Sequence, residues 1–156
     1  MNACRVRLAT ETDARSVCAL HRAAWEEVFS ASYLEPAEAE RRWSDVIKNK
    51  TVTVFLCEFD DKHVGFIAFH LSMTSLEIRD LYVFPSHRRH GIGRALVNDV
   101  LCRSGKRCPA TLWVAETSKP AISLYRKMGF NNTGETTTEL RRIDGGRMLK
   151  MYRKPQ

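Results

Sequence analysis

Apolar residues recur at helical spacing in the first third of the chain. After a short strand-like run at residues 4–8, one stripe consists of Ala14, Val17, Cys18, His21, Trp25, Val28 and Phe29. Thr10 and Asp13 precede this stripe with the spacing of a capping box, which predicts a helix start. We interpret His21 as a packed or edge histidine of this stripe rather than a catalytic one. A second helix is expected over Pro36–Ile47, because the fixed φ of proline suits a first helical position.

The middle of the chain changes to β-branched and aromatic runs. Runs at 51–59 and 63–71 flank a short polar turn and predict a hairpin, and a third strand is expected at 75–84. The elements expected after it are a helix at 92–103, a buried strand at 110–115, a short helix at 118–130, and a final hairpin of 134–143 and 147–154 around an Asp-Gly-Gly turn.

This order of elements predicts an α/β fold with a mixed sheet, formed by a single domain over residues 1–156. The chain is 44% hydrophobic and 28% charged, as in an ordinary compact protein. Its 25 basic and 18 acidic residues give a net charge of +7, so the surface should attract anions. The charge alone does not distinguish RNA, DNA, acidic lipid and a phosphorylated small molecule.

The cysteines and the N-terminal segment indicate the cellular setting. Five scattered cysteines without C-x-x-C spacing predict neither a zinc site nor a disulfide framework, and we expect no metal. The first residues have no apolar core of signal-peptide length, and no later run reaches the roughly 18 apolar residues of a membrane span. We therefore expect a cytoplasmic protein that does not insert into membranes.

The segment HRRHGIGRAL, residues 87–96, joins a strand to a helix through two glycines. Backbone N–H groups at such a helix start point in one direction, and the helix dipole adds positive charge there. Arg88, Arg89 and Arg94 could add charge-assisted contacts to phosphate oxygens. No Lys-Ser or Lys-Thr follows the glycines, which argues against nucleoside triphosphate hydrolysis. The loop is predicted to bind an anion.

Two blocks of the sequence resemble the GCN5-related N-acetyltransferase (GNAT) superfamily. Residues 88–93, Arg-Arg-His-Gly-Ile-Gly, fill the pattern Gln/Arg-x-x-Gly-x-Gly/Ala after the strand end at Leu81–Pro85. Residues 121–130, AISLYRKMGF, look like the second hallmark of this superfamily, A-x-x-L-Y-x-x-x-G-F. The order of elements agrees with the superfamily from end to end. One departure is Ser118, where the superfamily commonly has Asn.

The resemblance implies acetyl-CoA as the acetyl donor, bound in a cleft where two central strands splay apart. The glycine loop would then hold its pyrophosphate, and the strand before it would pair with the pantetheine arm. The implied cofactor-binding residues are Leu81, Tyr82, Val83, Arg88, Arg89, His90, Gly91, Ile92, Gly93, Arg94, Ala95, Ser118 and Tyr125.

Acetylation of an amine needs a base and benefits from an acid. Glu77 and Asp80 are the candidate bases, and related enzymes often have an acidic residue at the position of Glu77. Strand alternation places the two on opposite faces unless a bulge intervenes. The resemblance implies that Tyr125 protonates the departing thiolate, whereas a tyrosine that only packs a short helix is the alternative.

The acceptor is expected to be the primary amine of a small molecule, which attacks directly in a ternary complex. Trp25, Phe29 and Tyr33 are the candidate substrate-binding residues. Acylation of a protein or peptide amine is the alternative reaction. A non-catalytic CoA-binding module and a nucleic-acid-binding module are the alternative classes, although no recognition-helix or RNP-like signature supports specific nucleic-acid binding. A homodimer is possible.

Overall fold

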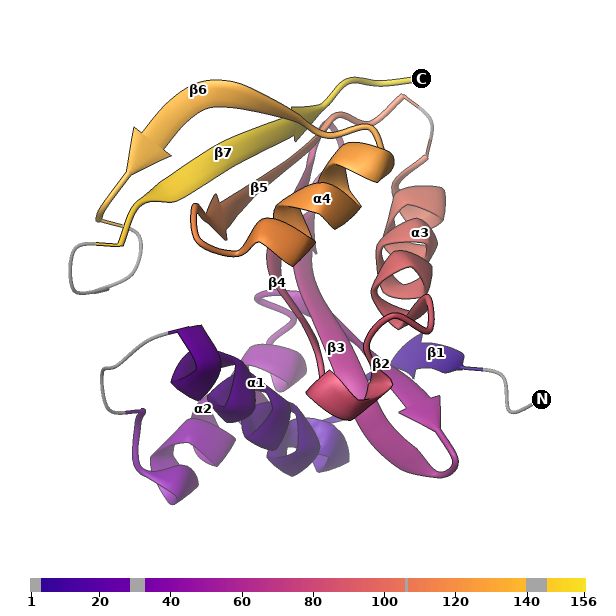
Figure 1. The fold of residues 1–156 in the computed structure, drawn as a ribbon. Coiled ribbons are helices and arrows are strands. Elements are labelled where there is room, and N and C mark those ends of the chain that lie inside the picture. The colour runs from indigo at the N-terminus through magenta and orange to yellow at the C-terminus, as the bar shows by residue number, and fades with distance from the viewer. Residues whose placement is uncertain (1–3, 29–32, 106, 140–145) are drawn as a thin grey trace.

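The computed structural model describes residues 4–28, 33–105, 107–139 and 146–156, which form one mixed sheet covered by helices on both faces (Figure 1). The strands are β1 (Arg5–Leu8), β2 (Thr53–Phe59), β3 (Lys62–Leu71), β4 (Leu76–Val83), β5 (Ala110–Ala115), β6 (Asn131–Thr137) and β7 (Met148–Arg153). Their order in the sheet is β1-β2-β3-β4-β5-β7-β6. Neighbouring strands are antiparallel except β4 and β5, which are parallel. The predicted fold class and order of elements are confirmed.

The helices begin where their capping residues predict. They are α1 (Ala14–Val28), α2 (Pro36–Lys48), α3 (Ile92–Ser104) and α4 (Lys119–Lys127), with short 3₁₀ helices η1 (Glu11–Asp13) and η2 (Pro85–His87). The Asp13 carboxylate accepts a hydrogen bond from the backbone N–H of Thr10 at 2.8 Å, half of the predicted capping box. Pro36 is the first residue of α2, as expected.

Two apolar layers lie on opposite faces of the sheet. The alternation of β2 shows this directly: Phe55 and Cys57 belong to the layer under α3 and α4, whereas Val54 and Leu56 belong to the layer under α1 and α2. Figure 1 shows α1 and α2 together, apart from α3 and α4. Side chains of β4 are divided in the same way: some face α1 and α2, and the others face α3 and α4.

The predicted hairpin between β2 and β3 turns through Asp60 and Asp61, which both have positive φ, 49° and 56°. Positive φ at both central residues is the geometry of a tight two-residue hairpin turn, which Asp tolerates better than most residues. The final hairpin differs from its prediction, because β6 begins at Asn131 rather than at residue 134. Most of the Asp-Gly-Gly turn expected there lies outside the described residues.

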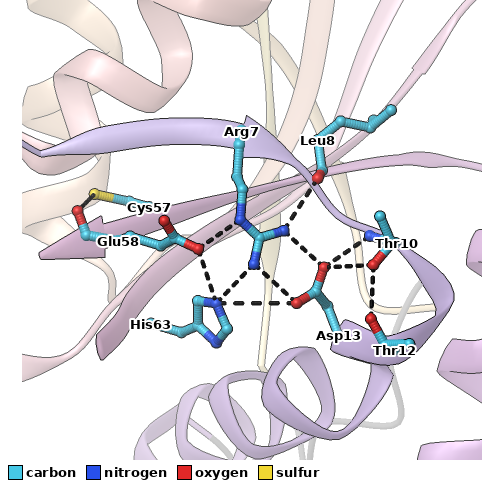
Figure 2. Close-up of polar contacts among 8 residues, drawn as sticks. All are labelled: Arg7, Leu8, Thr10, Thr12, Asp13, Cys57, Glu58 and His63. Atoms are coloured by element: carbon cyan, nitrogen blue, oxygen red, sulfur yellow. Dashed lines mark hydrogen bonds and ion pairs between the residues drawn. The ribbon is translucent and has the colours of Figure 1, made fainter. Parts of the chain in front are cut away.

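Arg7 joins β1 to η1 and to the β2–β3 hairpin through a cluster of charged side chains (Figure 2). Its guanidinium donates to both oxygens of Asp13, at 2.7 and 2.9 Å, and also to Glu58 on β2. His63 on β3 lies 3.0 Å from the same guanidinium and 3.3 Å from the Glu58 carboxylate. Arg7 holds the pKa of Asp13 and of Glu58 below the usual range.

The structure corrects one expectation about the cysteines. A disulfide joins Cys4, just before β1, to Cys57 on β2, with Cα atoms 6.1 Å apart. Cys18, Cys102 and Cys108 are free. Scattered spacing did not reveal the pair, because β1 and β2 are neighbours in the sheet although distant in the sequence. Among the described residues, no group of His, Cys, Asp and Glu is placed to hold a metal ion.

Candidate acetyl-CoA and acceptor site

β4 and β5 separate in the middle of the sheet. Their parallel ladder joins Leu76–Ile78 to Ala110–Leu112. Beyond this short ladder β4 continues to Val83 and β5 to Ala115, and within the described sheet these parts pair only with β3 and β7, respectively. Figure 1 shows the two strands diverging toward α4. The predicted splay is therefore present, and within the described sheet β4 has no strand partner on the side of β5 beyond Ile78.

The glycine loop leads from β4 through η2 into the first turn of α3. Gly91 is the N-cap residue of α3 and has φ 81°, and Arg89 also has positive φ, 67°. A Cβ at Gly91 would meet no atom within 4 Å, so glycine is needed for its backbone conformation rather than for lack of space. The N–H groups of the first turn, at Ile92, Gly93 and Arg94, have no partner inside the helix. The structure thus contains the helix start that the sequence predicts to bind an anion.

Gly93 has a different reason to be glycine. A Cβ there would lie 3.2 Å from Cδ2 of Leu124 on α4 and 3.9 Å from Cγ2 of Val83 on β4. The absent side chain thus lets α3 approach α4 and the end of β4. The second glycine of the motif fixes how the helix start sits beside the diverging strands, and the first glycine shapes the loop.

Arg88 connects the glycine loop to α1. Its Nη1 and Nη2 donate to the two carboxylate oxygens of Glu27 at 2.6 and 2.7 Å, and its Nε donates to the carbonyl oxygen of Val83 at 2.9 Å. The guanidinium also lies 5.4 Å from the centre of the Tyr82 ring. The pair lowers the pKa of Glu27. These bonds use three of the five N–H donors of Arg88, so a phosphate, as expected from the sequence, would have to reach the remaining two or displace Glu27.

A bulge in β4 places Glu77 and Asp80 on one face of the sheet. The register with β3 shifts at this point, because Ala68 pairs with Asp80 whereas Phe69 pairs with Ile78. Ala68 belongs to the layer under α1 and α2, so its partner Asp80 faces the same way. Ile78 belongs to the opposite layer, which turns its neighbour Glu77 toward α1 and α2 as well. Of the two arrangements considered from the sequence, a regular strand and a strand with a bulge, the structure has the bulge.

His21 lies between Asp80 and an aromatic cluster. Its Nε2 is 3.6 Å from Oδ1 of Asp80, and its Nδ1 is 2.7 Å from the hydroxyl of Tyr33. The imidazole is packed among rings, as expected, with ring centres at 5.2 Å for Trp43 and 6.4 Å for Trp25. The contact with Asp80 was not predicted from the sequence. Burial raises the pKa of Tyr33 to about 12.

The remaining candidate residues lie at both ends of the site. Tyr125 on α4 is 5% exposed and packs edge-on against Phe130, with ring centres 5.7 Å apart. Ser118 is the N-cap residue of α4, and its carbonyl oxygen accepts the first helical bond from Ile122. Phe29, a candidate substrate-binding residue, lies outside the described residues.

The domain thus combines a strand pair that opens, a helix start whose first N–H groups have no partner inside the helix, and two carboxylates on one face of the sheet. The family model described as "Acetyltransferase (GNAT) family" matches residues 14–130. The chain therefore belongs to the GNAT family. The family and its cofactor-bound structures indicate an acetyl-CoA-dependent acyltransferase domain.

Relatives by sequence are N-acetyltransferases. The chain is 27% identical over 146 residues to a probable N-acetyltransferase of Mycobacterium tuberculosis, a match that covers 86% of this chain and 83% of the relative. It is 36% identical over 85 residues to an uncharacterized N-acetyltransferase of Methanocaldococcus jannaschii, covering 49% of this chain. This second match spans 38% of the length of that relative.

Solved structures share the fold over nearly the whole chain. The ribosomal-protein-alanine N-acetyltransferase of Brucella melitensis superposes with a TM-score of 0.78 at 20% identity, covering 96% of this chain and 99% of the other. The PaiA N-acetyltransferase of Thermoplasma acidophilum, solved with coenzyme A, gives 0.74 at 19% identity, covering 97% and 99%. In the described part of the chain, no helix is both long and apolar enough to cross a membrane.

Proposed function

We propose that this protein transfers an acetyl group from acetyl-CoA to a primary amine of a small molecule, which attacks directly in a ternary complex. The observation that carries the proposal is the bulge in β4. It turns both Glu77 and Asp80 toward α1 and α2, beside the point where β4 leaves β5. Two carboxylates are thereby available on one face to attract and deprotonate a cationic amine.

The residues near the diverging strands fit acetyl-CoA. The first turn of α3 offers its N–H groups to the pyrophosphate, and the open space beside Gly91 lets an anion approach the backbone. Arg89 and Arg94, both exposed, add positive charge. The part of β4 from Leu81 to Val83, which has no strand partner on the side of β5 in the described sheet, would supply backbone groups for the amides of the pantetheine arm. Acetyl-CoA would supply the reactive thioester carbonyl group.

The side chains of this chain are proposed to move two protons. A lysine-like amine with a pKa near 10.4 is unprotonated in only about one molecule in 2,500 at pH 7, so a base is needed. Glu77 or Asp80 accepts the amine proton, directly or through water. The hydroxyl of Tyr125 donates a proton to the departing sulfur. Tyr125 lies on α4, the helix that follows β5 in the chain.

A small acceptor is favoured by the walls on this side of the sheet. The rings of His21, Trp25, Tyr33 and Trp43 pack against one another with centres 5.2–6.4 Å apart. Such a compact wall suits a small amine with an apolar part. Acetylation of a peptide amine is the second candidate, supported by the ribosomal-protein-alanine N-acetyltransferase that shares the fold.

The test is acetyl-CoA turnover, measured as free thiol, against polyamines, aminoglycosides, amino acids and peptides. We expect turnover with a small amine, and a decrease of kcat/KM of about 10²- to 10⁴-fold in Asp80→Asn or Glu77→Gln, whichever removes the base. Asp99→Asn on the outer side of α3 is the matched control, because its carboxylate bonds only to Arg103 in a surface pair. Turnover with peptides alone would favour the second candidate. Tight CoA binding without any turnover would indicate a non-catalytic module.

A further inference from the structure

His21 stands at the centre of a chain of polar contacts that ends at Asp80. The chain starts at Trp43 on α2, passes through Tyr33 and His21, and reaches β4. The side chains of His21 and Asp80 are each 18% exposed. Groups this well shielded interact more strongly than surface groups, because water screens them less. The arrangement brings three segments of the chain to one candidate base.

The hydrogen bonds of Tyr33 determine where the proton of neutral His21 lies. The Trp43 indole N–H only donates, so the Tyr33 oxygen accepts from it. Because its raised pKa keeps the phenol protonated, Tyr33 has one proton to donate. The nearest strong acceptor is Nδ1 of His21 at 2.7 Å, since the thiol of Cys18 accepts only weakly. If Tyr33 donates to Nδ1 of His21 instead of to Cys18, neutral His21 carries its own proton on Nε2, the nitrogen that faces Asp80.

We propose that His21 is a positioning residue for Asp80 in the acetyl-transfer reaction, which rests on the proposed function. When the substrate is bound, its Nε2–H would donate to Oδ1 of Asp80 and so fix the orientation of the carboxylate that takes the proton of the amine. The separation of 3.6 Å is longer than a hydrogen bond. Hydrogen bonds of this kind are commonly long in a free enzyme and tighten when the substrate is bound.

The surroundings of His21 define the alternative that the experiment must exclude. Rings of Trp43, Tyr33, Phe66 and Trp25 surround the imidazole, so its role could be only to fill space between α1, α2 and β3. Among the described residues, the titratable and charged groups around this cluster include Cys18 and Arg22 on α1, Tyr33 before α2, Glu40 on α2 and Asp80 on β4. A packing role does not depend on a donor at Nε2, whereas the positioning role does.

The first measurement needs no acceptor. Nitrogen-15 NMR of the histidine rings should show His21 as the Nε2–H tautomer at neutral pH, assigned by its loss in His21→Gln. Tyr33→Phe should remove the preference for this tautomer, and Asp80→Asn should shift the Nε2 resonance. An Nδ1–H tautomer in the wild-type protein, or a resonance unaffected by Asp80→Asn, would overturn the proposal even if the enzyme is active.

The second measurement compares His21→Leu with His21→Gln in steady-state kinetics. Leu fills space without a donor, whereas the Gln amide can place an N–H near the position of Nε2. We expect His21→Leu to lower kcat by about 10- to 100-fold, the usual cost of losing an orienting partner. Its acid limb in the pH profile of kcat/KM should move to higher pH, since a carboxylate without its donor is protonated more easily. His21→Gln should keep most of kcat, and CoA affinity should stay unchanged in both.

Two results separate this proposal from the proposed function. Equal losses of kcat in His21→Leu and His21→Gln, with the acid limb of the pH profile unmoved, would assign His21 to packing alone. Turnover by the wild-type protein would in that case still support the transferase function. Absence of wild-type turnover with every amine would contradict the proposed function, and the NMR result would still decide the contact with Asp80. His63→Gln is the control histidine, because His63 lies in the Arg7 cluster rather than near Asp80.

Discussion

Arg88 and Glu27 form a bidentate ion pair that joins the glycine loop to the last turns of α1. The guanidinium donates to both carboxylate oxygens, at 2.6 and 2.7 Å, across 61 residues of sequence. Both side chains are about 40% exposed, at 39% and 40%, so the pair contributes little to folding stability. Its significance lies in its position, since one partner belongs to the candidate cofactor loop and the other to the helix that carries His21.

The pair predicts competition between Glu27 and a cofactor phosphate for Arg88. Glu27→Gln removes the competing charge, so we expect CoA to bind about 2- to 5-fold more tightly, as for a surface charge contact of up to about 1 kcal/mol. Arg88→Gln should weaken binding by a similar factor, and the double variant should resemble Arg88→Gln. Isothermal titration calorimetry at two salt concentrations measures these changes. Equal CoA affinities in all four proteins would show that Arg88 serves only to hold α1.

The glycine at the start of α3 allows a sharply matched comparison with the glycine at its end. Gly91 and Gly105 have φ of 81° and 82°, and a Cβ at either would meet no atom within 4 Å. Replacing either with Val strains the backbone by about 1–2 kcal/mol or more. Only Gly91→Val changes the loop that presents the N–H groups of α3. We expect about a tenfold or greater loss of CoA affinity in Gly91→Val, equivalent to about 1.4 kcal/mol, and none in Gly105→Val.

Thermal unfolding of the two glycine variants provides the control. Gly105→Val should lose at least as much stability as Gly91→Val, because Gly105 combines φ 82° with ψ 158°, a conformation almost restricted to glycine; a loss of binding confined to Gly91→Val is then not due to strain alone. If Gly91→Val binds CoA as tightly as Gly105→Val does, the first turn of α3 is not the pyrophosphate site.

Replacing Tyr125 with Phe distinguishes a catalytic role of its hydroxyl from a packing role of its ring. Its ring packs against Phe130, and Phe at position 125 keeps this contact while removing the hydroxyl. If the hydroxyl protonates the departing sulfur, Tyr125→Phe lowers kcat by about 10²-fold or more with unchanged melting temperature and CoA affinity. Tyr152→Phe on β7 is the control, because Tyr152 is 39% exposed. An unchanged kcat in Tyr125→Phe would assign the residue to the core alone.

The sequence predicted the elements because their signals are local. Helical spacing, the proline at the start of α2 and the aspartates of the β2–β3 turn each act within a few residues, and the structure contains all three. The glycine loop was predicted for the same reason. The match with the family extends this agreement from single elements to the whole fold.

The side-chain arrangement of the site depends on contacts that have no local signal. His21 meets Asp80, and Glu27 meets Arg88, only because α1 crosses the end of β4. The bulge in β4 did leave a trace: its residues that pack toward α3 and α4 are two apart at Leu76 and Ile78, but the next is Leu81. This change of spacing around Arg79 is the pattern of a strand with one inserted residue.

The Arg7 cluster predicts how stability depends on pH. The pKa values of Asp13 and Glu58 lie below their ordinary values of 3.8 and 4.5, so the unfolded chain binds protons more readily than the folded protein. Their contribution is complete above about pH 5 and is lost as the pH falls through the ordinary values toward the lower folded ones. Asp13 is the better probe, because its side chain is 9% exposed and accepts two hydrogen bonds from Arg7.

Urea unfolding between pH 3 and pH 7 tests this linkage. Asp13→Asn should lower the unfolding free energy at pH 7 by about 1–3 kcal/mol, since Arg7 loses a buried charged partner. The difference from wild type should shrink below about pH 4, where the unfolded wild-type chain is already protonated at this residue. Glu116→Gln removes the exposed pair with Arg147 and should change the pH dependence much less. A difference that stays constant from pH 7 to pH 3 would mean that Asp13 acts through its capping hydrogen bond with Thr10 and not through its charge.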